Sequence, residues 1–281
     1  MENATTFFAT LSAWLWGWPM IILLLGTHVF LTIRLRFPQR KLLTAIRLSV
    51  QRDSSQQGDV SQFGALATAL AATIGTGNII GVATAVALGG PGAVFWCWLT
   101  GVFGISTKYA EALLAIKYRV RSEGGRMQGG PMYALERGLG WRKMGVLFAV
   151  FTALAAFGIG CTVQANAIST IMHASYGIGT EVCGVVLTLL TAAVIIGGVS
   201  SISKVCSMLV PLMALLYVLG CVYILQANAS YVVPALRLIV RSAFSPEAAG
   251  GGFAGGSVIM AARYGIARGL FSNESGLGSA P

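Results

Sequence analysis

A glycine-rich polar run, Gly75-Thr76-Gly77-Asn78, interrupts the apolar stretch 64–89 near its middle. Glycine and asparagine are poor helix formers, so we expect a helix over this stretch to break at the run. A break in apolar surroundings exposes backbone N–H groups, which bind a carboxylate, and backbone carbonyls, which bind a cation. The plainer interpretation is close packing of an intact helix, because Gly77 and Gly81 have the G-x-x-x-G spacing.

A second polar run, Ser272-Asn273-Glu274-Ser275-Gly276, follows the apolar stretch 253–271. By itself it predicts the end of a helix, and the plainer interpretation is a simple loop. Two interrupted apolar stretches in one chain favour a transport site, because broken helices supply the substrate and ion contacts of many transporters. We therefore expect both runs to belong to a transport site.

The apolar stretch 144–173 contains a polar side chain that needs a partner. Phe157 and Gln164 are seven residues apart, so on a regular helix they share a face with Cys161. An amide is costly in an apolar span unless it is hydrogen-bonded. Gln164 therefore predicts either a hydrogen bond between helices or a substrate-lining position, with Phe157 shaping the apolar side of the pocket and Gly160 leaving room.

The composition indicates that a membrane surrounds these runs. The chain has 281 residues, of which 56% are hydrophobic and only 10% are charged. Soluble domains carry about 25% charged residues and disordered chains are far less hydrophobic, so both classes are excluded. The apolar runs are too long and continuous for a transmembrane β-barrel. An all-α, polytopic membrane protein is predicted, with seven apolar segments at 11–33, 64–89, 92–117, 144–173, 180–200, 205–226 and 253–271.

Basic residues are concentrated on one side of these segments. Most of the nineteen Lys and Arg residues follow the first, third and fifth segments, which predicts an external N-terminus. The net charge of +10 therefore reflects membrane topology, and we expect no nucleic-acid partner. The five cysteines lie inside apolar segments without a C-x-x-C pair, so they predict neither a disulfide framework nor a metal site.

The order of the segments predicts an internal repeat. Five segments separate the start of the first broken stretch from the start of the second, and because five is odd the two stretches run in opposite directions. This is the arrangement of an inverted five-helix repeat. It divides the chain into an N-terminal transmembrane helix with an amphipathic cytoplasmic linker (1–63), a first repeat (64–226), and an external loop with the broken helix that starts a second repeat (227–281).

The sequence resembles the alanine or glycine:cation symporter family along its whole length. The resemblance rests on WGWPMIILLLGTHVFLTIRLRFPQ, GALATALAATIGTGNIIGVATAVALGG, GGPMYALERGLG and RGLFSNESGLGSAP. It implies a LeuT-type inverted five-helix repeat with an extra N-terminal helix. It also implies sodium-coupled symport of a small neutral amino acid, alanine or glycine, into the cell across the cell (inner) membrane. Because family members continue for several more helices, we expect the chain to be truncated at Pro281, with the second repeat cut off.

The resemblance also implies which residues bind substrate and ion. The N–H groups of the first break would meet the substrate carboxylate, and carbonyls around Phe271 would meet its ammonium group. The wider fold class places a co-transported sodium ion at the carbonyls of Ala71 and Ile74, and no organic cofactor is expected. The implied substrate contacts are Thr76, Gly77, Asn78, Phe157, Gln164, Phe271, Ser272, Asn273 and Gly276.

Other classes of function have less support in the sequence. Two histidines, with no G-x-S-x-G and no H-E-x-x-H motif, argue against an intramembrane enzyme. A channel would show no saturable, sodium-coupled uptake. An inactive truncated fragment or an assembly partner stays open as the alternative to an active symporter.

Overall fold

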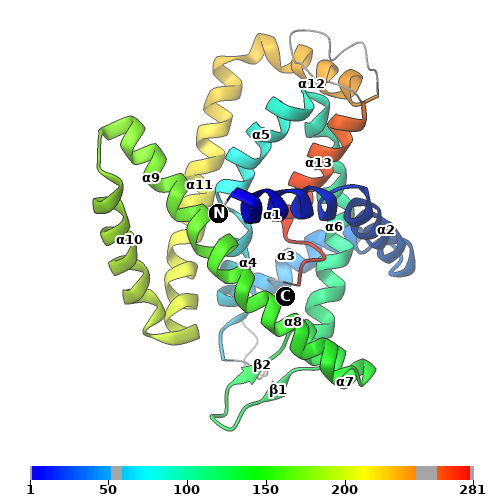
Figure 1. Cartoon of the computed structure of the whole chain (residues 1–281), viewed down its shortest axis with the longest axis vertical. Coiled ribbons are helices and arrows are strands. Elements are labelled where there is room, and N and C mark those ends of the chain that lie inside the picture. Colours follow the sequence, from blue (N-terminus) through cyan, green and yellow to red (C-terminus); the bar gives the residue numbers. More distant parts are fainter. Residues whose placement is uncertain (1, 52–58, 245–257, 279–281) are drawn as a thin grey trace. The chain divides into compact units, whose positions relative to one another are not determined.

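The computed structural model describes residues 2–51, 59–244 and 258–278 (Figure 1). These residues are mostly helical, and the chain forms two compact units that interleave along the sequence. These units do not correspond to the predicted division of the chain at residues 63 and 226, which stays a prediction. The first unit contains Met1–Leu42, Gly77–Ala110 and Tyr217–Leu277, and the second contains Leu43–Thr76, Glu111–Leu216 and Gly278–Pro281.

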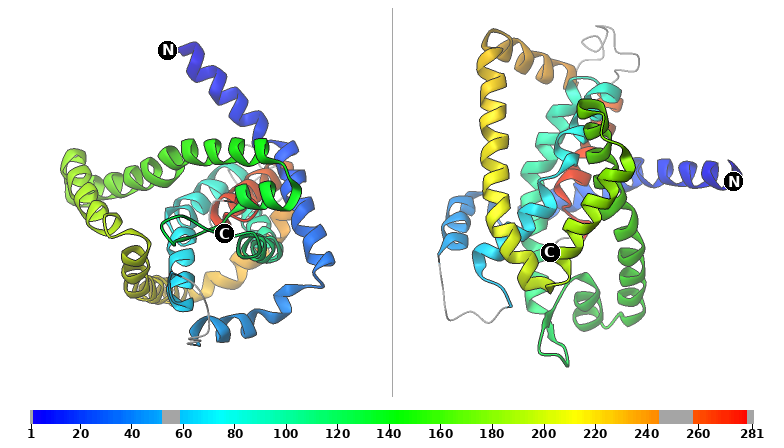
Figure 2. Two further views of the ribbon diagram at one scale, coloured as in Figure 1. Left: turned by 90° about the horizontal axis from the view of Figure 1, so that it is seen from below. Right: turned by 90° about the vertical axis from the view of Figure 1, so that its left-hand side faces the viewer.

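The first unit is built around α13. Figures 1 and 2 show this helix beside α5 and α6. On another side, Ala262, Ile266 and Leu270 of α13 form an apolar cluster with Ile21 and Leu24 of α2. The helices of this unit are α1 (Glu2–Leu15), α2 (Trp18–Arg34), the 3-10 helix η1 (Pro38–Lys41), α5 (Ile80–Gly89), most of α6 (Gly92–Lys117), the end of α11 (Gly198–Ala227), α12 (Ala229–Phe244) and α13 (Val258–Asn273).

Small residues allow α13 to approach α6 closely. A Cβ atom at Gly265 would collide with the carbonyl oxygen of Ala93, and one at Gly269 would collide with Oγ1 of Thr100. The thiol of Cys97 donates to the carbonyl of Gly265 at 3.0 Å. Close approach through small residues is the usual way in which helices associate in a membrane, where lipid is as apolar as the side chains.

The second unit contains one long helical rod and a short hairpin. Helix α8 continues through the π-helical segment η3 into α9 (Figure 1). The hairpin strands pair in antiparallel register, with Val120 opposite Gln128. The elements of this unit are α3 (Leu42–Val50), α4 (Gln62–Thr73), β1 (Val120–Arg121), β2 (Met127–Gln128), α7 (Pro131–Leu139), α8 (Arg142–Ala155), η3 (Ala156–Thr162), α9 (Val163–Tyr176), α10 (Thr180–Ile195) and the start of α11.

Several described helices are long and apolar enough to cross a membrane. Thr5–Arg34, Arg142–Tyr176 and Gly198–Ala227 meet this condition, and α4 together with Thr76–Gly89 would be a fourth span, bent at a short break. The chain is therefore a multi-pass membrane protein, as its composition predicted. The predicted segment 92–117 coincides with α6.

Some predicted boundaries are wrong. Helix α11 begins at Gly198 rather than near residue 205, because the chain turns at Gly198, which has φ +70°. The stretch 118–143, between the predicted apolar segments 92–117 and 144–173, contains the hairpin and α7. Residues 253–257 of the last predicted segment lie outside the described residues.

Candidate functional site

The first broken helix is present where the glycine-rich run predicted it. Helix α4 ends at Thr73, the 3-10 turn η2 covers Thr76–Asn78, and α5 begins at Ile80. No side chain caps the start of α5. The N–H groups of a helix's first turn have no acceptor within the helix, so the start of α5 is a favourable place for an anion. Gly77 and Asn78 lie in the 3-10 turn directly before α5.

The second break begins later than predicted. Helix α13 includes Ser272 and Asn273, so the prediction that these two residues are unwound is wrong. The backbone leaves the helix at Glu274, which has φ +50°, and Gly276 follows with φ +88°. A residue with left-handed backbone geometry commonly ends a helix, as Glu274 does here. The last carbonyls of α13, including that of Phe271, have no donor within the helix.

Helix α6 holds the turn that follows α13. The ammonium group of Lys108 donates to the carbonyl of Glu274 at 3.2 Å. A Cβ atom at Gly104 would lie 3.0 Å from Oγ of Ser275, and Gly276 packs toward Thr107. Thr107 and Lys108 follow Gly104 by three and four residues, so all three α6 positions lie on one side of the helix.

The first unit brings the two polar runs into direct contact. The hydroxyl of Ser272 donates to Oδ1 of Asn78, and a Cβ atom at Gly77 would lie 3.7 Å from Oγ of Ser272. Ser272 is only 8% exposed. The residues that the sequence singled out in two distant runs therefore meet, although the sequence did not predict this hydrogen bond.

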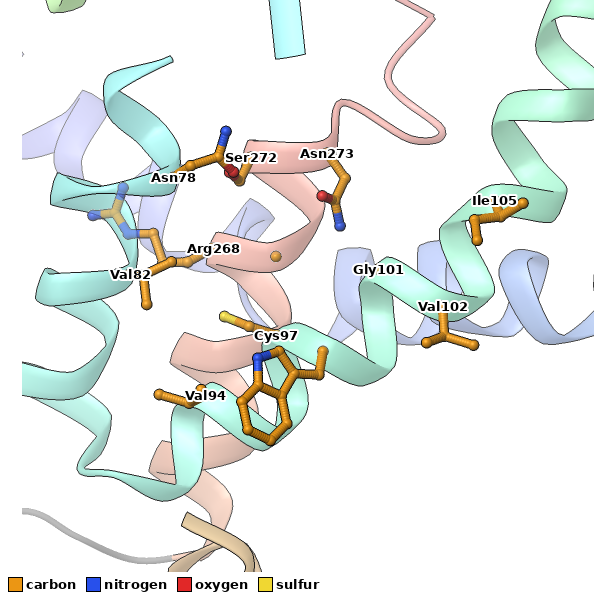
Figure 3. Close-up of a pocket in the computed structure, with 12 residues that line it drawn as sticks. Asn78, Val82, Val94, Cys97, Gly101, Val102, Ile105, Arg268, Ser272 and Asn273 are labelled. Carbon is orange, nitrogen blue, oxygen red and sulfur yellow. The ribbon is translucent and has the colours of Figure 1, made fainter. Parts of the chain in front are cut away.

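A pocket of about 510 Å³ lies beside this contact, between α5, α6 and α13 (Figure 3). Its size is in the range of small-molecule sites, which is about 300–1,000 Å³. Most of its wall is apolar, and the polar groups come mainly from the two broken helices. It is lined by Asn78, Val82, Val94, Cys97, Trp98, Gly101, Val102, Ile105, Arg268, Gly269, Ser272 and Asn273.

The second unit gives Gln164 the partner that its position required. The hydroxyl of Thr76 donates to Oε1 of Gln164 at 2.7 Å. A Cβ atom at Gly75 would lie 3.4 Å from Nε2 of the same amide, so glycine allows this approach. The predicted helix-to-helix hydrogen bond is confirmed, and a substrate role for either residue stays a prediction.

Other predicted site residues lie elsewhere. Phe157 belongs to the π-helical segment η3, is 77% exposed, and takes no part in the Thr76–Gln164 contact. Because a π-helix has more residues per turn than an α-helix, the seven-residue spacing does not place Phe157 and Gln164 on one face. The ring of Phe271 packs edge-on against Trp16 with centroids 6.3 Å apart. Gly276 lies in the turn outside the pocket wall.

The expected sodium position lies at the end of α4. Ala71 is in the last turn of this helix, and Ile74 caps it with an extended backbone, its N–H donating to the carbonyl of Leu70 at 2.7 Å. Within the described ranges, no three His, Cys, Asp or Glu side chains lie together as a metal site. The ligands that Ala71 and Ile74 offer to a cation are their backbone carbonyl oxygens. The sodium site at these two residues stays a prediction.

Comparison with known proteins identifies the family. The family model described as "Sodium:alanine symporter family" matches residues 1–281. The chain belongs to this family. The members of the sodium:alanine symporter family are transporters, and polar breaks within apolar helices are typical of transport sites.

Individual members of the sodium:alanine symporter family are similar over nearly the whole chain. The sodium/alanine symporter AgcS of Methanococcus maripaludis is 51% identical over 97% of this chain and 61% of its own length. An uncharacterised transporter of Haemophilus influenzae is 51% identical over 97% of this chain and 60% of its own length. The probable sodium/glutamine symporter GlnT of Bacillus subtilis is 37% identical over 95% and 55%. The chain thus spans about 60% of the length of the first two relatives.

Proposed function

We propose that the protein is a secondary active transporter that carries a small neutral amino acid, alanine or glycine, into the cell together with sodium. The observation that carries the proposal is the contact between the two broken helices, through Ser272 and Asn78, beside a pocket of about 510 Å³. Family membership and the names of the relatives support cation-coupled amino-acid transport. The location in the cell (inner) membrane, with the N-terminus outside, is part of the proposal.

The two charged ends of an amino acid fit the two helix ends of this unit. A helix start carries partial positive charge and a helix end carries partial negative charge. The substrate carboxylate would meet the N–H groups of Gly77, Asn78 and the uncapped start of α5. The ammonium group would meet the last carbonyls of α13, at Phe271 and Ser272. Asn273, which lines the same pocket, offers an amide to either group.

Further contacts complete the proposed substrate site. Thr76 directly precedes Gly77 in the chain and is a further proposed substrate contact, and its hydroxyl is oriented by the 2.7 Å hydrogen bond that it donates to Gln164. Gly276 allows the turn after α13 through its positive φ. We further propose that Phe157 limits the size of the substrate.

Sodium would couple to substrate through the same broken helix. The proposed ligands are the carbonyls of Ala71 and Ile74, directly before the turn that binds the carboxylate. A ligand shifts a conformational equilibrium only if it binds one conformation more tightly than the other. We expect a sodium ion at these carbonyls to bind one geometry of the break more tightly and so to stabilise it. In a LeuT-type inverted repeat, which we propose for this protein, the two repeats would then move about the occupied site.

Sodium-dependent binding tests the proposal without requiring transport. The protein at its full natural length is purified, and its thermal unfolding midpoint is measured with alanine, glycine or glutamine in sodium chloride or choline chloride. Ligand at 100 times its Kd stabilises the folded state by about 2.7 kcal/mol. We expect alanine or glycine to raise the midpoint in sodium only. An equal rise in choline would contradict sodium coupling, and no rise with any of the three would favour an inactive fragment or an assembly partner.

A further inference from the structure

Arg268 is a cationic side chain in the wall of the pocket described above. It lies on α13 four residues before Ser272, so the two side chains project from the same helix face. Figure 3 shows the Arg268 side chain extending toward α5, between Asn78 and Val82 in this view. A charged side chain in a mostly apolar pocket wall is costly unless it is paired, which makes Arg268 a candidate for binding a charged group.

Within the described residues, the pocket wall around Arg268 holds no acidic side chain. Within the described part of the chain, no hydrogen bond or ion pair reaches the Arg268 guanidinium. An arginine fork binds a carboxylate through two parallel hydrogen bonds, and these bonds strengthen where water is excluded.

A second arginine on the same helix shows that this placement is specific. Arg263 lies over the ring of Tyr264, 5.8 Å from its centroid, and its Nη2 lies 3.5 Å from the carbonyl of Ala13. Arg263 is not among the residues that line the pocket. In the sequence both arginines precede the second break. In the structure only Arg268 of the two lines the pocket, whereas Arg263 lies near Ala13 and Tyr264.

We propose that Arg268 binds the α-carboxylate of the transported amino acid, together with the first break. This inference rests on the proposed function, because it assumes that the pocket takes an amino acid. It adds a specificity determinant: Arg268 favours substrates with a free carboxylate and disfavours amines and amides of the same size. Asn78 and Arg268 then present an amide and a guanidinium to the same anionic group.

The test compares alanine with alaninamide, which has the same ammonium group and methyl side chain but no carboxylate. Each compound displaces labelled alanine from the purified full-length protein in sodium buffer. In the wild type we expect alanine to bind at least about tenfold more tightly than alaninamide, which corresponds to about 1.4 kcal/mol. Arg268→Gln should weaken alanine binding by about tenfold or more and change alaninamide binding less than twofold. Arg268→Lys should keep part of the preference, and the control Arg263→Gln should keep all of it.

The binding measurements distinguish failure of the proposed function from failure of the role proposed for Arg268. A wild type that binds neither compound refutes the proposed function itself. A wild type that binds both equally well refutes the role of Arg268 without any variant, even if Arg268→Gln fails to fold. Equal weakening of both compounds by Arg268→Gln, or a full preference retained in that variant, also overturns the inference.

Discussion

Removing the hydroxyl of Ser272 should loosen the contact between the two broken helices. In Ser272→Ala, Asn78 Oδ1 loses the hydrogen bond that Ser272 donates to it. A neutral hydrogen bond of this kind contributes about 0.5–1.5 kcal/mol. If this bond preorganises the pocket, the Kd of alanine should rise by about 2- to 12-fold. Equilibrium binding of labelled alanine to the purified full-length protein measures this change.

A double-mutant cycle separates the bond from other effects of the substitution. The effect of Ser272→Ala on the Kd of alanine is measured in the wild-type background and in the Asn78→Ala background, where the hydrogen-bond acceptor is already absent. We expect the effect of Ser272→Ala to disappear in the second background, because contacting residues are not additive. Ser49→Ala is the control, since the hydroxyl of Ser49 donates to the carbonyl of Ala45 in its own helix. An equal loss in both backgrounds would refute the reasoning.

Three further predictions follow from the packing and hydrogen bonds. Gly269→Ala forces a Cβ against α6 and should cost about 1–3 kcal/mol, which lowers the thermal unfolding midpoint. Gly26→Ala, with no atom within 4 Å of the new Cβ in the interior of α2, should not lower it; equal midpoints would count against the α6–α13 contact. Thr76→Val should reduce alanine uptake by about 2- to 12-fold in the wild type but not in Gln164→Leu, and additive losses would argue against the 2.7 Å bond. Lys108→Met should increase hydrogen–deuterium exchange in the turn after α13, and unchanged exchange would show that the lysine does not hold this turn.

The sequence predicted the elements of the site well because their signals are local. Glycine and asparagine at 75–78 weaken the helix wherever it lies, and the structure breaks there. The apolar stretch 92–117 has clear ends, and α6 has the same bounds. Gln164 needed a polar partner in apolar surroundings, and Thr76 supplies it.

The parts that sequence reasoning missed depend on contacts between distant segments. The break after α13 begins at Glu274, where Lys108 of α6 binds the carbonyl, and no local pattern in the Ser-Asn-Glu-Ser run marks that residue. The helix face predicted to be shared by Phe157 and Gln164 assumed a regular α-helical period, from which η3 departs. Arg268 and Arg263 look alike in sequence, and only the packing of α13 places the first in the pocket wall.

The most direct test of the account is uptake by proteoliposomes that contain the full-length protein. Labelled alanine is supplied outside, and an inward sodium gradient is imposed or collapsed with a sodium ionophore at the same final sodium concentration. We expect saturable uptake above the equilibrium level that depends on the gradient and is strongly reduced in Asn78→Ala. Alanine accumulation that is the same with and without the gradient would contradict sodium-coupled symport.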